Sequence, residues 1–171
     1  MWSEPTLVQR AEQPYVAITV RVPMDKLGEV VPPLNGAVFE WIADNGGQPS
    51  GPPFWKYNVI DMERELEIEA GVAVQQPMPG SGRVSAGVLP GGTYASLLHT
   101  GHPQELVDAT GALLDWAAGR GLAWDVVDDP AGERWAARLE LYRTDPSVQP
   151  DMAKWETELA FRVKDSDGSE A

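Results

Sequence analysis

The sequence contains no cysteine and only two histidines, His99 and His102, among its 171 residues. The absence of cysteine excludes disulfide bridges, thiolate metal sites and thiol nucleophiles. The two histidines lie three residues apart at an expected strand-to-helix turn, where capping of the helix is a better explanation than a metal site or an acid–base pair. We therefore expect no metal and no cofactor.

Long apolar runs are also missing. No segment approaches the roughly 18 to 20 consecutive apolar residues that a membrane-spanning helix needs. The first residues, Met-Trp-Ser-Glu-Pro, lack the basic start and the apolar stretch of a secretory signal. These two absences predict a soluble, cytoplasmic chain with no membrane partner.

Positive charge is scarce, because 13 Lys and Arg residues face 26 Asp and Glu residues and leave a formal net charge of −13. Binding to a phosphate backbone requires Lys and Arg, so we expect no direct binding to duplex DNA at physiological salt. A negative field concentrates cations near the surface, although an acidic surface also serves solubility alone.

The two halves of the chain repeat one pattern. A β-branched and aromatic strand over residues 13–20 is matched by a similar strand over residues 92–99. Each is followed by apolar residues at helical spacing and then by two more strands. The last strands of the two halves match most closely, and they cover residues 67–74 and 156–163. Each half therefore has the order β-α-β-β.

This repeat predicts an α+β fold with a tandem β-α-β-β organisation and pseudo-two-fold symmetry. An antiparallel sheet and two long helices would enclose a ligand cleft. Half-repeats at about 5–75 and 82–163 are each too small to be stable alone, so we expect them to share one core. Residues 1–164 then form a single domain, and residues 165–171 form a polar disordered tail.

Acidic side chains line one face of each final strand. Strict alternation places Glu67 and Glu69 opposite the apolar residues of the first, and Glu156 and Glu158 opposite those of the second. The apolar faces should pack on the helices. The carboxylates either meet water, which is the commoner outcome for an alternating strand, or are brought by the two-fold to one cleft. A glutamate among aromatic rings there would have a raised pKa unless a cation neutralised it.

Aromatic residues are abundant, with seven tryptophans in 171 residues. Some must pack in the core, since large aromatic side chains dominate protein cores. A cluster that stays open would suit flat aromatic ligands, and would attract organic cations through cation–π contacts. The candidates on or beside the expected strands are Trp55, Tyr57, Trp124, Trp135, Tyr142 and Trp155.

Six short segments, taken in their order and spacing, resemble the GyrI-like small-molecule-binding domains. This family includes the effector domains of multidrug-responsive transcription regulators and stand-alone gyrase-inhibitor proteins. The similarity extends over about residues 5 to 163, and unlike the regulators we expect a stand-alone form. The matching segments are residues 66–74, 89–95, 99–101, 114–116, 141–146 and 155–159.

The resemblance implies an aromatic cavity with a glutamate at its base. By position in the family motif that glutamate is Glu158, and the cavity tyrosine is Tyr142. Two departures concern the cavity rim. Many members have Gly-x-Tyr just before the second helix, whereas this chain has Gly101-His102-Pro103, and Arg162 stands where proline is common.

Together these features predict a protein that binds lipophilic, cationic aromatic small molecules, as a multidrug sensor or by sequestration, and that has no catalytic residues. We expect a monomer, and the sequence identifies no protein partner. The candidate ligand-binding residues are Glu158, Tyr142, Trp55, Tyr57, Trp135, Trp155, Glu156, Glu67 and Glu69.

Two alternatives remain open. The first is a hydrolase that opens reactive cyclopropane rings of genotoxic compounds, as some relatives are thought to do, with Glu158 as general base beside Tyr142. The second is a gyrase-inhibitor-like protein that acts on a protein partner through its acidic surface.

Overall fold

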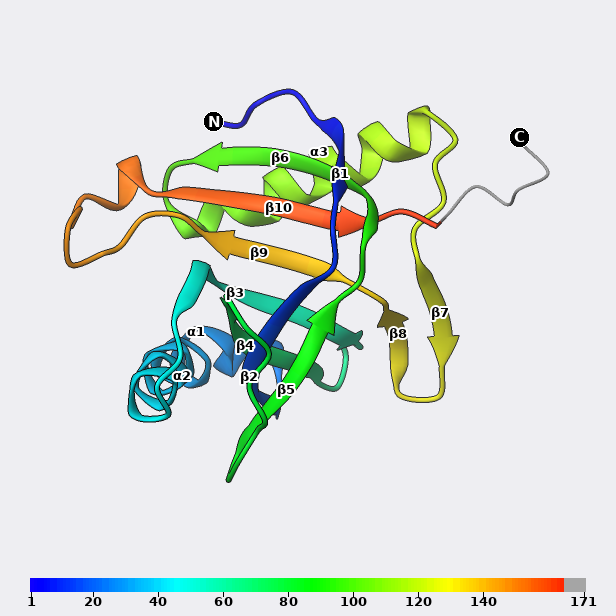
Figure 1. Cartoon of the computed structure of the whole chain (residues 1–171). Helices are drawn as coiled ribbons and strands as arrows, with labels where there is room; N and C mark the ends of the chain where they lie inside the picture. Colours follow the sequence, from blue (N-terminus) through cyan, green and yellow to red (C-terminus); the bar gives the residue numbers. More distant parts are fainter. Residues whose placement is uncertain (165–171) are drawn as a thin grey trace.

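One antiparallel sheet organises the molecule (Figure 1). The computed structural model describes residues 1–164, so the expected disordered tail at 165–171 lies outside the described residues. The α+β class is confirmed. The ten strands within the described residues are β1 (Thr6–Arg10), β2 (Gln13–Val22), β3 (Pro49–Ile60), β4 (Leu66–Val74), β5 (Val84–Leu89), β6 (Gly92–Thr100), β7 (Val126–Asp129), β8 (Gly132–Trp135), β9 (Arg138–Tyr142) and β10 (Glu156–Arg162).

The order of the strands displays the expected pseudo-two-fold symmetry. The sheet runs β1-β6-β10-β9-β3-β4-β2-β5, and the β7–β8 hairpin attaches to β3. Counted outward from the β3–β9 junction, β9 corresponds to β3, β10 to β4, β6 to β2 and β1 to β5. At the junction itself Trp55 of β3 lies opposite Glu140 of β9. The tandem β-α-β-β prediction is therefore confirmed.

The first strand of each half is exchanged into the other half. β1 precedes β2 in the chain but pairs with β6, while β5 precedes β6 but pairs with β2. The registers correspond, since Val8 lies opposite Tyr94 and Gly87 lies opposite Tyr15. Sequence patterns did not predict β1 or β5, because a short strand whose partner is distant in the chain has no local signal beyond its own few residues.

Two long helices, α2 (Pro32–Asp44) in the first half and α3 (Leu106–Gly119) in the second, cover one face of the sheet. Val38 and Ile42 pack on β2 and β4, and Leu106 and Leu113 pack on β6 and β10. His102 caps the entry to the second helix by accepting the backbone N–H of Gln104, as expected. No helix among residues 1–164 has the length and apolar content needed to cross a membrane. The remaining α-helix of the described residues is α1 (Leu27–Val30).

The opposite face of the sheet forms a second core to which both halves contribute. Tyr15 and Phe54 of the first half pack with Tyr94, Leu139 and Leu141 of the second. Because strand side chains alternate, Leu139 and Leu141 point into this core while their neighbours on β9 point toward the helices. The two faces of β9 are therefore chemically distinct.

A glycine in β4 makes room for this second core. A Cβ atom added to Gly71 would lie 2.6 Å from Cζ and 2.8 Å from Cε1 of Phe54, whose ring is fully buried. We expect Gly71→Ala to destabilise the fold by about 1–3 kcal/mol, because a tightly packed core does not accommodate an extra methyl group. Chemical denaturation followed by tryptophan fluorescence measures the loss.

Gly36→Ala is the matched control for this substitution. Gly36 lies in α2, and a Cβ atom there would meet nothing within 4 Å. Alanine is the better helix former, so this change should stabilise the protein by up to about 1 kcal/mol. Equal stability of the Gly71→Ala variant and the unmodified protein would show that the Phe54 ring can move away.

Candidate functional site

Three polar or aromatic side chains follow one another on the helix-facing side of β9: Arg138, Glu140 and Tyr142. Opposite Glu140, on β3, lies Trp55, whose indole N–H donates to Oδ1 of Asn35 on α2 at 2.8 Å. The contact with α2 places Trp55 on the face that the helices cover. We call the group formed by Trp55, Tyr57, Arg138, Glu140 and Tyr142 the Glu140 cluster.

Glu140 is held by two tyrosine hydroxyl groups. Tyr142 donates to Oε1 of Glu140 at 2.6 Å, and the hydroxyl of Tyr57 also hydrogen-bonds this carboxylate. The ring of Tyr142 contacts that of Trp55 edge to face, with 5.2 Å between the centroids. Within residues 1–164 no basic nitrogen lies within 4.0 Å of Glu140, so no ion pair neutralises it.

The environment penalises the charge of Glu140. Burial raises the pKa of this carboxyl group, and the hydrogen bonds from the two tyrosines and the charge of Arg138 offset the rise only in part. Burial, followed by the nearby carboxylate, raises the pKa of Tyr142, which therefore stays a neutral hydrogen-bond donor. Glu140 and Tyr142 each keep some accessible surface. The cluster can thus accept a cation, or a proton, at Glu140.

Glu158, the glutamate that the family motif indicated, lies on the other face of the sheet. It is paired with Leu141 and Leu98 in the ladder, and its carboxylate forms ion pairs with Arg10 at 2.6 Å and with Arg143. Burial would raise its pKa, but the two arginines lower it below the ordinary value. The expectation of an unpaired Glu158 among aromatic rings was wrong, since two cations already neutralise it.

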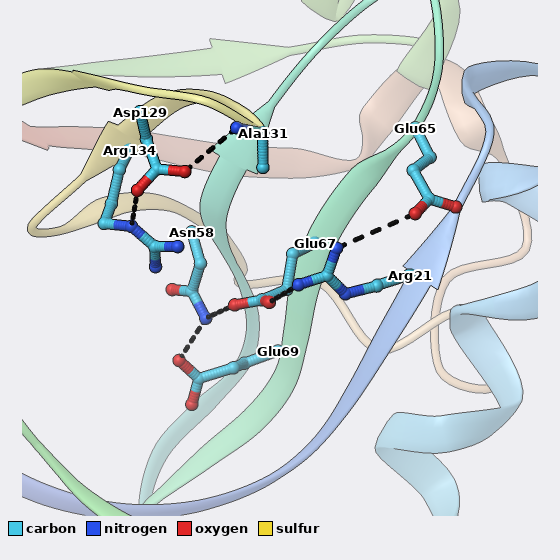
Figure 2. Close-up of polar contacts among 8 residues, drawn as sticks. All are labelled: Arg21, Asn58, Glu65, Glu67, Glu69, Asp129, Ala131 and Arg134. Carbon is cyan, nitrogen blue, oxygen red and sulfur yellow. Dashed lines mark hydrogen bonds and ion pairs between the residues drawn. The ribbon is translucent and has the colours of Figure 1, made fainter.

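Glu67 and Glu69 are also neutralised within the protein (Figure 2). Arg21 donates to Glu67 at 3.2 Å, and the side-chain amide of Asn58 bridges Glu67 and Glu69. Lys56 lies 3.4 Å from Glu69. The apolar faces of these strands do pack on the helices, as predicted. Both sets lie on the face away from the helices, but β9 and β3 separate β10 from β4, and Glu69 and Glu158 each have a cation of their own.

The remaining candidates are placed as follows. Trp55, Tyr57 and Tyr142 meet in the cluster, and Trp135 joins its edge through a contact with Arg138. Trp155 precedes β10 and donates to the carbonyl of Gln149 at 2.7 Å, while Glu156 is exposed. The ligand-binding roles of these residues stay predictions.

Sequence reasoning missed Glu140, although a signal for it was present. In the segment Arg138-Leu-Glu-Leu-Tyr142 the alternation places Glu140 on the same face as Tyr142. A carboxylate two residues from the expected cavity tyrosine, with leucines on both sides, is the pattern that would have identified it.

Two recesses occur outside this cluster, and the first of them reaches Trp135 at its edge. The first has a volume of about 370 Å³ and the second about 280 Å³, and neither is lined by Glu140 or Tyr142. Charged groups that line them already have ion-pair partners, as Arg134 has in Asp129 and Arg21 has in Glu67 (Figure 2). We therefore place the candidate site at the Glu140 cluster, where a buried charge lacks a partner.

A family of small-molecule-binding domains matches nearly the whole chain. The model of the family described as GyrI-like small molecule binding domain matches residues 3–164. The chain belongs to this family. A search of the curated proteins found no match.

Solved structures share the fold. The C-terminal domain of EcmrR has a TM-score of 0.74 at 20% identity, over 95% of this chain and 98% of that one. In the EcmrR–DNA complex the match covers 96% of this chain but only 58% of the EcmrR chain (TM-score 0.75, 20% identity). SAV2435 bound to tetraphenylphosphonium has a TM-score of 0.60 at 14% identity, over 98% of this chain and 96% of that one. A hydrolase from Listeria innocua has a TM-score of 0.61 at 16% identity, over 94% of this chain and 92% of that one.

Replacing Glu140 by glutamine should stabilise the unliganded protein at neutral pH by on the order of 1 kcal/mol, because the substitution removes an unneutralised, partly buried charge. The folded-state pKa of Glu140 lies above its unfolded value, so the cost of its charge is present at neutral pH. That cost disappears as the pH falls below about 4.3, the ordinary pKa of glutamate. Unfolding free energies at several pH values should show the gain shrinking toward acid.

Glu158→Gln should have the opposite effect and destabilise the protein by about 1–3 kcal/mol, since Arg10 and Arg143 lose their carboxylate partner. The folded-state pKa of Glu158 is lowered, so its contribution is present above about 4.3 and is lost as the pH falls through the folded value. The same denaturation series measures both variants. Destabilisation by both would mean that Glu140 also has a counter-ion.

Proposed function

We propose that this chain binds lipophilic aromatic cations, as a multidrug sensor or by sequestration, with Glu140 as the counter-ion. One observation carries the proposal: a partly buried carboxylate with a raised pKa has two tyrosine donors and no basic partner within 4.0 Å in residues 1–164. A bound cation would supply the missing charge. The raised pKa reports the cost that such a ligand would remove.

The rings around Glu140 suit the rest of such a ligand. Trp55 and Tyr142 meet edge to face, and Tyr57 is close enough to the carboxylate for its pKa to be raised by it. An aromatic cation would gain about 0.5–2 kcal/mol from each ring face that it contacts, and apolar burial would add to this. The tyrosine hydroxyls keep the carboxylate oriented, so binding requires little rearrangement of polar groups.

Two further observations support a cationic ligand. The net charge of −13 raises the local concentration of cations at the surface. SAV2435, which shares the fold, has been solved with tetraphenylphosphonium bound, and that ion is a lipophilic aromatic cation. The proposal includes no DNA binding by this chain, because a net charge of −13 disfavours contact with a phosphate backbone.

Glu140→Gln should weaken the binding of tetraphenylphosphonium by about ten- to 150-fold, which is the scale for losing one contact between charged groups. The neutral compound triphenylphosphine oxide should lose little affinity, because its phenyl rings still contact Trp55 and Tyr142. Isothermal titration calorimetry with both compounds measures the difference.

Glu158→Gln is the matched control, because it removes an equal charge from the neighbouring strand on the opposite face of the sheet. It should leave the affinity for both compounds within about twofold. The proposal fails if the two glutamine substitutions weaken the binding of tetraphenylphosphonium equally, or if neither substitution weakens its binding.

A hydrolase is the second candidate function. A carboxylate with a raised pKa, 2.6 Å from a tyrosine hydroxyl, could activate water as a general base while the tyrosine donates to the developing charge. The shared fold with a hydrolase from Listeria innocua is consistent with it. Incubation with a strained cyclopropane electrophile, followed by mass spectrometry, would detect addition of one water. This role requires that Glu140→Gln abolish the addition.

A further inference from the structure

Arg138 is held among three aromatic rings at one end of the Glu140 cluster. Its guanidinium carbon lies 4.6 Å from the ring centroid of Phe161, 4.7 Å from that of Trp135 and 5.9 Å from that of Tyr57. Burial lowers the pKa of this arginine, but a guanidinium group remains protonated in proteins. The cluster therefore contains a fixed positive charge as well as a negative one.

The donors of Arg138 are not used. Within residues 1–164 this guanidinium forms no hydrogen bond and no ion pair. The other arginines with comparable burial have partners, since Arg10 pairs with Glu158 and Arg162 pairs with Asp125. Arg138 keeps some accessible surface, so its N–H groups are available to an acceptor that comes from outside the protein.

The two charges of the cluster lie side by side without neutralising each other. Arg138 and Glu140 are two residues apart on one face of β9, a spacing of about 7 Å along the strand. Glu140 accepts a hydrogen bond from Tyr142, and Arg138 contacts the rings of Trp135 and Phe161. Their separation is too large for a direct hydrogen bond, and it matches a ligand that carries both signs of charge.

Contacts with aromatic rings do not use the N–H groups of the guanidinium, and these groups suit an anion. When a planar guanidinium contacts rings, its N–H groups remain in the plane and can bind a carboxylate with two parallel hydrogen bonds. A ring system that lies along β9 would place a cationic group at Glu140 and a carboxylate at Arg138.

We infer that the site prefers zwitterionic aromatic ligands, an inference that rests on the proposed function. In such a ligand a delocalised or quaternary cation faces Glu140, and a carboxylate roughly 7 Å away binds Arg138. This defines a narrower ligand class than lipophilic cations in general. Simple cations would bind through Glu140 alone and would be repelled by Arg138.

Rhodamine B and its ethyl ester test this inference, because they share one cationic ring system and differ in a single carboxylate. Arg138→Gln should weaken the binding of rhodamine B by about tenfold or more, which corresponds to at least about 1.4 kcal/mol. The affinity of the same variant for the ester should stay within about twofold or increase. Fluorescence anisotropy titrations of both dyes measure the affinities.

Two further variants keep the test informative. Arg138→Lys retains the charge and the aliphatic stem without the planar fork, so it should lose part of the affinity for rhodamine B and stay folded. Arg134→Gln removes an exposed arginine that pairs with Asp129 outside the cluster, and it should change neither affinity. Thermal unfolding of each variant verifies that the binding data refer to folded protein.

The outcomes separate the inference from the function on which it rests. Equal effects of Arg138→Gln on both dyes, or an effect on the ester alone, would overturn the role of Arg138 while Glu140 could still bind cations. If the ester binds the unmodified protein and the Glu140→Gln variant equally well, the proposed function itself is wrong. Selective loss of rhodamine B in the Arg138→Gln variant, with the ester still dependent on Glu140, supports both.

Discussion

The pairing of β3 with β9 is the contact on which the rest of the structure depends. It joins the two halves into one sheet, and it places Trp55 directly opposite Glu140 at the pseudo-two-fold position. On one side of this junction lie the helices, and on the other lies the core that contains Phe54 and Leu139. A single cross-strand contact therefore positions the unneutralised charge and also closes the core beneath it.

The fold was predictable because its signals are local and repeated. Alternation along residues 67–74 and 156–163 fixed which faces are apolar, and helical spacing between the strands fixed the order of elements. The ion pairing of Glu158 was not predictable, since its partner Arg10 is 148 residues away and reaches it only through the exchanged strand β1. A Glu-x-Glu pattern predicts which face of the strand a carboxylate occupies, but it does not predict which basic side chain will form an ion pair with it.

The symmetry of the backbone does not extend to the chemistry of the side chains. Glu69 and Glu158 occupy corresponding places on β4 and β10, and each is neutralised by a cation on the face away from the helices. At the junction, by contrast, the corresponding positions hold Trp55 and Glu140, one apolar and one charged. The repeat thus contains one candidate site instead of two, and this candidate site combines aromatic side chains from one half with a charge from the other.

The exchange of β1 and β5 makes the two halves dependent on each other in a further way. If the chain were divided between residues 75 and 82, each fragment would carry an edge strand that belongs to the sheet of the other fragment and would lack its own. Neither fragment could satisfy the backbone groups of its β2 or β6 edge alone. Two such fragments should recombine into one complex, and because Trp55 and Glu140 lie on different fragments, only the recombined complex would contain the assembled cluster.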